Sequence, residues 1–331
     1  MATLVYADIF DFPLKKQEIW ERMVGSRKSE VGSRIKQKER DFVSSLKSLV
    51  KQGKIEKSGE FYFLKGRREI VGKRLRREGE SLRKLKRAKK IAAILKIIPT
   101  VKFVGVSGGL AAMNADKNDD IDFFIITSAN WLWTTRFLVT FLLSLLGLRR
   151  KVGGKIYRDK ICLNMFLDEK YLDIFWQNRN IFTAYEIMLL KPLWQRNDVY
   201  RKFLSANLWV KNFLPNSLHT VIPSDSRGIP LAEDRLAKGI PLLAPKFRGL
   251  VGMTKQSNGY ITEWLNKIEK VFYKFQIWWM KGKRTKEIIT PYFIKFHPKD
   301  LKEEVLRKFE NKLSFEHHQC AQRDSNPRPT A

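Results

Sequence analysis

The hydrophobic and polar positions of the chain predict a mixed α+β protein built around a short stretch near its middle. Apolar residues run through Val101–Val106 and again through Phe123–Ile126, and the positions between them are glycine-rich and polar. A short apolar run bounded by turn residues is typical of a buried strand. We therefore expect strand, glycine turn, short helix, loop and strand over residues 101–127, with a third core strand at Lys160–Leu167.

Two helices followed by a small hairpin are expected in the first 66 residues. Apolar residues recur at helical spacing within Lys15–Val24 and again within Glu39–Gln52. Residues 53–64 then have the pattern of strand, turn and strand. This order resembles a winged helix-turn-helix domain. The resemblance implies either contact with nucleic acid through one helix or docking to a protein partner.

The most basic part of the chain is Lys65–Lys90, in which apolar residues recur among many lysines and arginines. The pattern predicts a long, partly amphipathic helix that continues through Ile98 until Pro99 ends it. Such a surface can bind phosphate backbones with a strong dependence on salt. Lysine stems on a solvated helix can equally cover apolar surface, and both interpretations stay open.

The second half of the chain is predicted to be mainly helical. Trp131–Leu148 is very apolar and approaches the roughly 20 residues that cross a bilayer, but it contains Arg136. We favour a buried helix that connects two strands of the sheet. Membrane association is disfavoured, but peripheral attachment through this segment and the Arg149-Arg150-Lys151 that follows it stays as a minor alternative. The other expected segments are helices at Asn180–Trp194, Asp198–Phe213 and Gly259–Trp279, a last amphipathic helix at Thr290–Leu313, and an irregular linker at residues 216–250.

Composition narrows the class of protein and of partner. The chain has 331 residues, of which 44% are hydrophobic, so two or three domains with real cores are expected. Its net charge of +30 favours polyanionic partners, including nucleic acid bound through the basic N-terminal third. Two cysteines far apart, Cys162 and Cys320, give no disulfide framework. This cysteine usage and the lack of a signal-peptide pattern predict a cytoplasmic protein.

The last 18 residues, 314–331, change abruptly in character. His317, His318 and Cys320 could ligate a metal, but three ligands packed so closely rarely form a structural zinc site. We expect a disordered tail. Its RDSNPRP segment resembles the artefactual ends of open reading frames that run into non-coding sequence, so no function is assigned to it.

The candidate chemistry lies at the start of the second core strand. Side chains alternate between the faces of a strand, so Asp120 and Asp122 are expected to point the same way. Neighbouring carboxylates repel each other, and a divalent cation such as Mg²⁺ relieves that repulsion. The glycine turn at Ser107, Gly108 and Gly109 allows a backbone to approach a phosphate closely. The alternative is a solvated acidic loop that simply enters a strand.

The stretch resembles the signature of the DNA polymerase beta-type nucleotidyltransferase superfamily. That signature is an apolar strand, Gly-Ser, a short helix and loop, and Asp-x-Asp in the next strand. Gly108 and Gly109 stand where Gly-Ser belongs, and Asp120 and Asp122 match the metal-binding pair. The resemblance implies two Mg²⁺ ions and transfer of a nucleoside monophosphate from a nucleoside triphosphate (NTP) to an acceptor hydroxyl.

The chain departs from this signature at several positions. Gly109 replaces a serine, and Leu110-Ala111-Ala112 lacks the arginine of many small members. The superfamily usually supplies a third carboxylate from the next strand, where this chain has Asn164, which cannot act as a base. Asp168 is a weaker substitute. Glu186 is spaced from Thr183 as in a capping box, and a capping or surface role is favoured for it over the alternative of facing a substrate.

Together these expectations describe a small mixed-sheet nucleotidyltransferase core with an N-terminal winged-helix-like domain and a C-terminal helical region. The predicted parts are 1–66 winged-helix-like, 67–99 basic linker helix, 100–215 core, 216–250 linker, 251–313 helical region and 314–331 tail. The first functional hypothesis is a Mg²⁺-dependent nucleotidyltransferase with an unidentified acceptor. The alternative is a catalytically degenerate core in a nucleic-acid-binding or partner-docking protein, a hypothesis motivated by Gly109 and Asn164.

Overall fold

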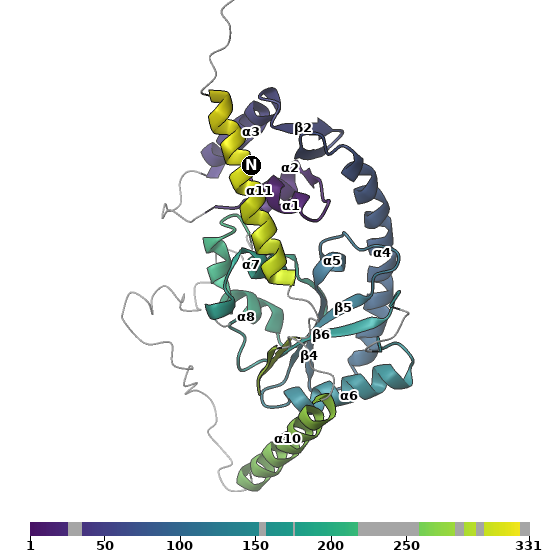
Figure 1. Cartoon of the computed structure of the whole chain (residues 1–331). Helices are drawn as coiled ribbons and strands as arrows, with labels where there is room; N and C mark the ends of the chain where they lie inside the picture. Colours follow the sequence, from purple (N-terminus) through teal and green to yellow (C-terminus); the bar gives the residue numbers. More distant parts are fainter. Residues whose placement is uncertain are drawn as a thin grey trace, which may run out of the picture.

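The computed structural model describes residues 1–25, 35–151, 157–174, 176–217, 258–281, 288–295 and 301–324. These residues form two sheets surrounded by helices (Figure 1). One sheet has three strands in the order β1-β3-β2, and the other has six in the order β7-β4-β5-β6-β9-β8. The larger sheet contains both parallel and antiparallel pairs. The predicted α+β class with a mixed sheet is confirmed at this level.

The small sheet and three helices form the N-terminal part. In chain order the elements are α1 Ala2–Asp8, β1 Leu14–Lys15, α2 Lys16–Glu21, α3 Ile35–Lys51, β2 Ile55–Ser58 and β3 Phe61–Leu64. The expected hairpin at 53–64 is confirmed, and β1 pairs with its second strand. Helix α1 was not predicted. Its residues Thr3–Asp8 are all buried, so packing rather than an amphipathic pattern stabilises this short helix.

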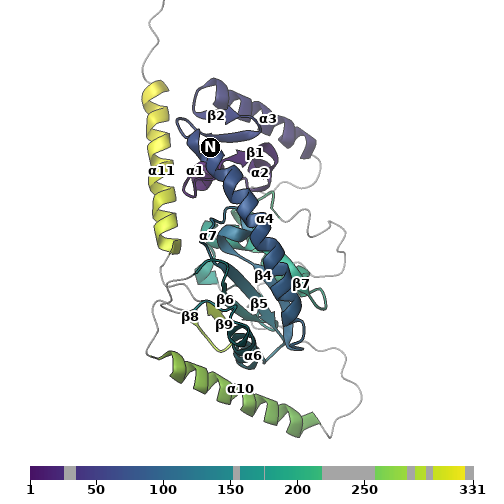
Figure 2. The ribbon, with the colours of Figure 1, turned by 90° about the vertical axis from the view of Figure 1, so that its right-hand side faces the viewer.

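Helix α4, Glu69–Leu95, runs from the small sheet to the large one (Figure 2). Its second half buries Ala88, Ile91, Ala92 and Leu95 in the same core as strands β4 and β5. The expected long helix is therefore confirmed, with its end at Leu95 just before Pro99. Two basic residues of this helix, Arg74 and Lys84, are buried.

The centre of the large sheet follows the predicted order. Strand β4 (Val101–Val106) leads into α5 (Gly108–Ala111) and then into the antiparallel strand β5 (Ile121–Thr127). Strand β6 (Ile161–Asp168) pairs with β5 in parallel, which requires a crossover connection. Helix α6, Leu132–Leu145, lies in that crossover, as expected. None of the helices that the structure describes is both long and apolar enough to span a bilayer.

The predicted helix over Asn180–Trp194 is wrong in its second half. Helix α7 ends at Leu189, and β7 (Lys191–Gln195) pairs with β4 at the edge of the sheet. Pro192 explains the change, since proline disfavours helical geometry at the preceding residue and is tolerated on edge strands. Helix α8 (Val199–Ala206) and a 3₁₀ helix (Leu208–Asn212) follow, and another 3₁₀ helix (Trp176–Asn178) precedes α7.

The C-terminal region is not purely helical. Helix α10, Asn258–Met280, packs on α6, but β8 (Ile288–Ile289) and β9 (Phe293–Lys295) extend the large sheet beyond β6. Helix α11 runs over Leu301–Asp324, so the helix predicted at Thr290–Leu313 begins later and ends later. Residues 314–324 are thus helical rather than part of a disordered tail. Residues 325–331 and most of the expected linker lie outside the described residues.

Candidate functional site

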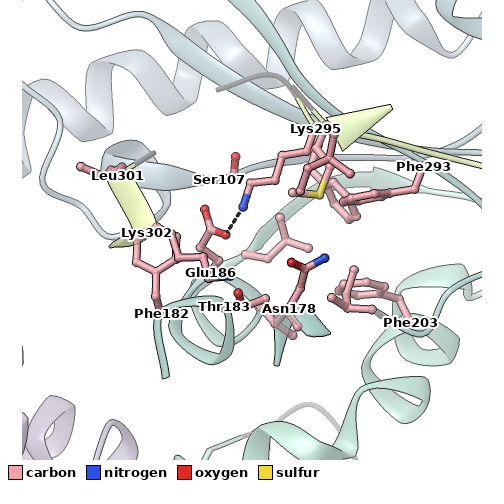
Figure 3. Close-up of a pocket in the computed structure, with 16 residues that line it drawn as sticks. Ser107, Asn178, Phe182, Thr183, Glu186, Phe203, Phe293, Lys295, Leu301 and Lys302 are labelled. Atoms are coloured by element: carbon pink, nitrogen blue, oxygen red, sulfur yellow. Dashed lines mark hydrogen bonds and ion pairs between the residues drawn. The ribbon is translucent and has the colours of Figure 1, made fainter. Parts of the chain in front are cut away.

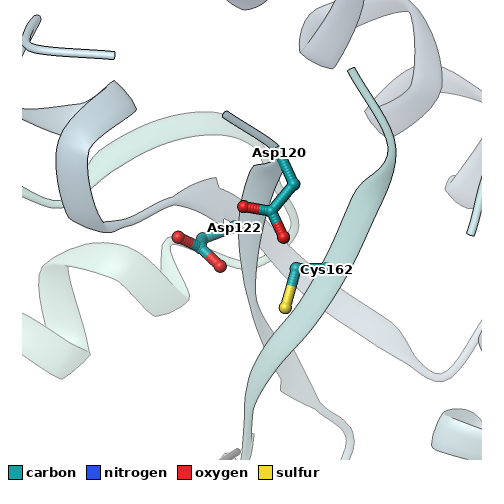
Figure 4. Close-up of side chains that lie close together, drawn as sticks. All are labelled: Asp120, Asp122 and Cys162. Carbon is teal, nitrogen blue, oxygen red and sulfur yellow. The ribbon is translucent and has the colours of Figure 1, made fainter. Parts of the chain in front are cut away.

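The two predicted carboxylates lie together at the start of β5. Ligand atoms of Asp120, Asp122 and Cys162 lie within 4.8 Å of one another (Figure 4). Cys162 comes from β6, where it is the register partner of Asp122. Cys162 was not expected beside this pair, because the register of two parallel strands depends on packing. Two carboxylates and a thiol therefore form one cluster where the two interior strands β5 and β6 begin.

The glycine turn lies directly against this cluster. Gly108 has a φ of +62°, and a Cβ added there would lie 3.0 Å from Oδ2 of Asp122. Ser107 donates its backbone N–H to the Asp122 carbonyl at 3.0 Å, which continues the β4–β5 pairing. Glycine is required at 108 both for its backbone conformation and for this close approach. At Gly109 an added Cβ would meet its nearest atom, the Asn114 carbonyl oxygen, only at 3.7 Å.

The electrostatics of the cluster are unfavourable for two charged carboxylates. Burial, with the neighbouring Asp120 carboxylate, raises the pKa of Asp122 to about 7. Burial and the adjacent Asp122 also raise the pKa of the Cys162 thiol well above its ordinary value. Paired carboxylates fit the oxygen-rich environment that Mg²⁺ prefers, whereas a protonated thiol is a poor ligand for that ion. The donor set therefore fits Mg²⁺ held by Asp120 and Asp122, with Cys162 beside it.

Arg150 provides the positive charge nearest to the pair. Its Nη1 lies 2.6 Å from Oδ2 of Asp120, and its guanidinium lies 4.3 Å from the centre of the Tyr157 ring. The backbone bridge between Arg149 and Ile161 holds this residue beside the start of β6. Arg150 lowers the pKa of Asp122, but burial and Asp120 outweigh it. The Arg150 guanidinium thus pairs with Asp120 and offsets the charge of Asp122 only in part.

Helix α4 holds the loop that leads into the acidic pair. The fully buried Lys84 donates to the carbonyls of Lys117 (3.2 Å) and Asp119 (2.6 Å) and to Asp159 (2.8 Å). One turn earlier, Ser81 accepts the N–H of Ala115 at 3.0 Å. An ammonium has three donors, and here all three have partners. The helix therefore fixes the backbone immediately before Asp120.

Asn164 lies close to the glycine turn but is not part of the carboxylate cluster. It is the extra residue of a β-bulge, since Phe123 pairs with Leu163 and Phe124 with Met165. Its Nδ2 contacts the Ser107 hydroxyl at 3.3 Å. Its Oδ1 is buried and has no hydrogen-bond partner among the residues that the structure describes. A buried carbonyl oxygen without a partner is costly and is common where a ligand completes the site.

Asp168 does not replace the missing third carboxylate. It pairs with Thr127 at the other end of β6, and six residues of strand place it roughly 20 Å from Cys162. Its carboxylate accepts the N–H groups of Asn130 (2.6 Å) and Lys170 (2.9 Å), although burial raises its pKa to about 6. Asp168 therefore organises the loop after β5, and the suggestion that it serves the acidic pair is wrong.

A mostly apolar cavity of about 160 Å³ opens beside Ser107 (Figure 3). Phe182, Phe203 and Phe293 line it, and Glu186 and Lys295 pair across it at 2.8 Å. Glu186 also raises the pKa of Asp122, so its charge acts on the acidic pair. The capping role expected for Thr183 and Glu186 is wrong, because the Asn180 side chain caps α7 by accepting the Thr183 N–H at 3.0 Å.

Comparison of the chain with protein-family models, with curated proteins and with solved structures finds no match. The interpretation of the site therefore depends on its geometry. Sequence reasoning found Asp120, Asp122 and the glycine turn but missed Cys162, Arg150 and Lys84. No pattern around Lys84 distinguishes it from the other basic residues of α4. Arg150 and Cys162 are recognisable only once β6 is paired with β5.

Proposed function

We propose that this protein is a Mg²⁺-dependent nucleotidyltransferase that moves a nucleoside monophosphate from an NTP to an acceptor hydroxyl. The observation that carries the proposal is the approach of the Gly108 turn to Asp122 beside Asp120. A glycine backbone can approach a phosphate closely, and the two neighbouring carboxylates can bind the cation that accompanies it. The resemblance of residues 101–127 to the nucleotidyltransferase signature supports the same conclusion.

The residues have distinct roles in this proposal. Asp120 and Asp122 would hold the metal, which would activate the acceptor oxygen and stabilise the leaving pyrophosphate. Gly108 and Gly109 let the backbone approach the triphosphate, and Ser107 lies at the boundary with the cavity. Arg150 holds the Asp120 carboxylate in place through an ion pair of 2.6 Å. Lys84 positions the backbone before Asp120.

The acceptor proton requires a base that Asn164 cannot provide. Glu186 is the candidate, because it lines the cavity beside Ser107 and its charge acts on Asp122. Its partner Lys295 keeps it within the cavity at 2.8 Å. The proposed acceptor therefore enters from the cavity side and presents its hydroxyl between Glu186 and the acidic pair. Substitution Glu186→Gln should slow transfer without abolishing NTP binding.

Covalent labelling tests the proposal. The protein is incubated with each labelled NTP, Mg²⁺ and either total RNA, total protein or a small-molecule extract. We expect label transfer by the wild type and a loss of roughly a thousandfold or more in Asp120→Ala/Asp122→Ala. The control is Asp116→Asn, in the same loop but exposed and outside the cluster. Equal transfer by the double variant and the wild type would end the proposal.

A second function is favoured for the N-terminal part. The order of helix, strand, two helices and two strands, with β3 between β1 and β2, supports a winged-helix domain. Exposed Lys47 and Lys51 on α3 suit contact with a phosphate backbone. We propose that this domain brings nucleic acid to the core, or serves as the binding part if the core is inactive. Salt-sensitive DNA binding without covalent label would favour the second case.

A further inference from the structure

The cavity beside Ser107 has the size of one aromatic ring. Its volume is about 160 Å³, and apolar cavities of about 150 Å³ in other proteins bind a single benzene molecule. Sites for larger ligands occupy roughly 300–1,000 Å³. A nucleotide, with its base, sugar and phosphate, therefore cannot be enclosed by this cavity. The space admits one six-membered ring with a short substituent.

Buried apolar side chains form most of the cavity wall (Figure 3). Phe182, Phe203 and Phe293 each expose 6% or less of their surface. The surrounding core holds these rings in place. Phe203, for example, packs against Phe124 with ring centres 5.4 Å apart. Because the wall belongs to a packed core, its shape is fixed before a ligand enters.

The polar groups of the cavity are few and largely paired. Glu186 and Lys295 form an ion pair at 2.8 Å, and their side chains expose only 17% and 16% of their surface. Lys295 also lies 5.7 Å from the centre of the Phe182 ring. The Thr183 hydroxyl donates to Oδ1 of Asn180 at 3.4 Å. A ligand rich in hydroxyl groups would leave most of them without a partner in this cavity, which is costly in a buried site.

We propose that the acceptor is a small aromatic alcohol whose ring fills this cavity. The inference rests on the proposed function and names the substrate class of the same site. Ser107 lines the cavity and precedes Gly108, where an added Cβ would lie 3.0 Å from Oδ2 of Asp122. A ring in the cavity can therefore present its hydroxyl to Glu186 on the side of the acidic pair.

The transfer of the nucleotide to such an alcohol balances within the site. The acceptor oxygen bonds to the α-phosphorus of the NTP, the bond from that phosphorus to its bridging oxygen breaks, and pyrophosphate leaves. Glu186 takes the hydroxyl proton. The hydroxyl groups of sugars, including the ribose ends of RNA, fit less well because their rings are polar on every side. Nucleic acid bound by the N-terminal part is then not the acceptor.

Ring binding is tested first without NTP or Mg²⁺, so that the result does not depend on transfer. Fluorine NMR compares para-fluorobenzyl alcohol with fluorodeoxyglucose, whose ring is of similar size but carries hydroxyl groups, in the presence of the full-length protein. We expect line broadening of the aromatic alcohol alone. No broadening of its signal would overturn the inference.

A matched pair of variants locates the bound ring. Ile187 lines the cavity, whereas Met188, the next residue of α7, does not. Ile187→Phe fills part of the space and should weaken binding of the aromatic alcohol by about tenfold or more. Met188→Phe should bind it as the wild type does. Circular dichroism verifies that both variants fold, and equal binding by the two would overturn the inference.

Transfer is tested next, with labelled NTP, Mg²⁺ and a set of single-ring alcohols (phenol, benzyl alcohol and phenylethanol) beside glucose, RNA and protein. We expect label on an aromatic alcohol, with a loss of about tenfold or more in Ile187→Phe and little loss in Met188→Phe. Label on glucose, RNA or protein instead would overturn the inference and leave the proposed function intact. Ring binding without label on any acceptor would support the ring site and overturn its role in transfer.

Discussion

Two groups of charged side chains lie next to each other around the 116–120 loop and differ in how far each charge is balanced by a partner of opposite sign. In the first group, Lys84 has a partner for each donor, and Arg83 contacts both oxygens of Asp159 at 2.8 and 2.9 Å. These contacts hold the pKa of Asp159 well below its ordinary value. In the second group, Asp122 lies beside Asp120 with its pKa raised to about 7. Compensated charge stabilises the fold, and uncompensated charge marks the place where a ligand is needed.

The largest effect on stability is expected when the first group loses its lysine. Lys84→Met leaves Asp159 with one partner fewer and two carbonyls without a donor. We expect unfolding free energy to fall by about 3–5 kcal/mol, because two carbonyls lose their donor at about 1–3 kcal/mol each and Asp159 loses one of its charged partners. Urea unfolding measures the change. Lys86→Met, on the exposed side of the same helix, should stay within about 0.5 kcal/mol of the wild type.

Removing a charge from the second group should raise the unfolding free energy instead of lowering it. Asp122→Asn removes a charge that the fold disfavours and should raise the unfolding free energy by about 2 kcal/mol near pH 8. This value is discounted because the residue is half-buried rather than fully enclosed.

The sign of the pH dependence sharpens this prediction. The folded-state pKa of about 7 lies above the model value of 3.8, so the folded protein binds the extra proton between these values. The contribution of the Asp122 carboxyl to the stability of the wild type therefore falls as pH rises from about 4 to 7, and then levels off. The advantage of Asp122→Asn should be absent near pH 4 and complete near pH 8. Thermal denaturation across this pH range measures the difference in stability between the variant and the wild type. A variant less stable than the wild type at pH 8 would contradict the claim that the charge of Asp122 destabilises the fold.

The smallest expected effect on stability comes from substitutions in the glycine turn that faces the acidic pair. Gly108→Ala should cost about 1–2 kcal/mol, because the backbone is left-handed there and the new Cβ would lie against Asp122. Gly109→Ala should change stability by less than about 0.5 kcal/mol, since its Cβ has room. Under the proposed function, only Gly108→Ala should also impair label transfer. Equal losses of stability in the two variants would contradict the prediction that a side chain is tolerated at position 109 but not at position 108.

Sequence patterns located the centre of the fold because its contacts are local. Strands β4 and β5 begin and end within two residues of their predicted bounds, as the alternation of apolar residues reflects their burial. The edge strands β7 and β8, and β9 next to β8, were missed. They are two to five residues long, and their pairing with β4 and β6 comes from distant parts of the chain. Short segments carry too little periodicity to indicate a strand on their own.

The sequence by itself determined the strand–turn–strand unit that contains Gly108 and Asp122, because the apolar runs at 101–106 and 123–126 and the glycine turn between them are local patterns. Only the tertiary structure decided which other groups join them. Cys162, Arg150 and Lys84 reach the site through the β5–β6 register and the passage of α4. Only the structure likewise shows that Glu269 and Gln276 of α10 contact the start of α6. Contacts between residues distant in the chain depend on how whole elements pack, and no local pattern encodes that packing.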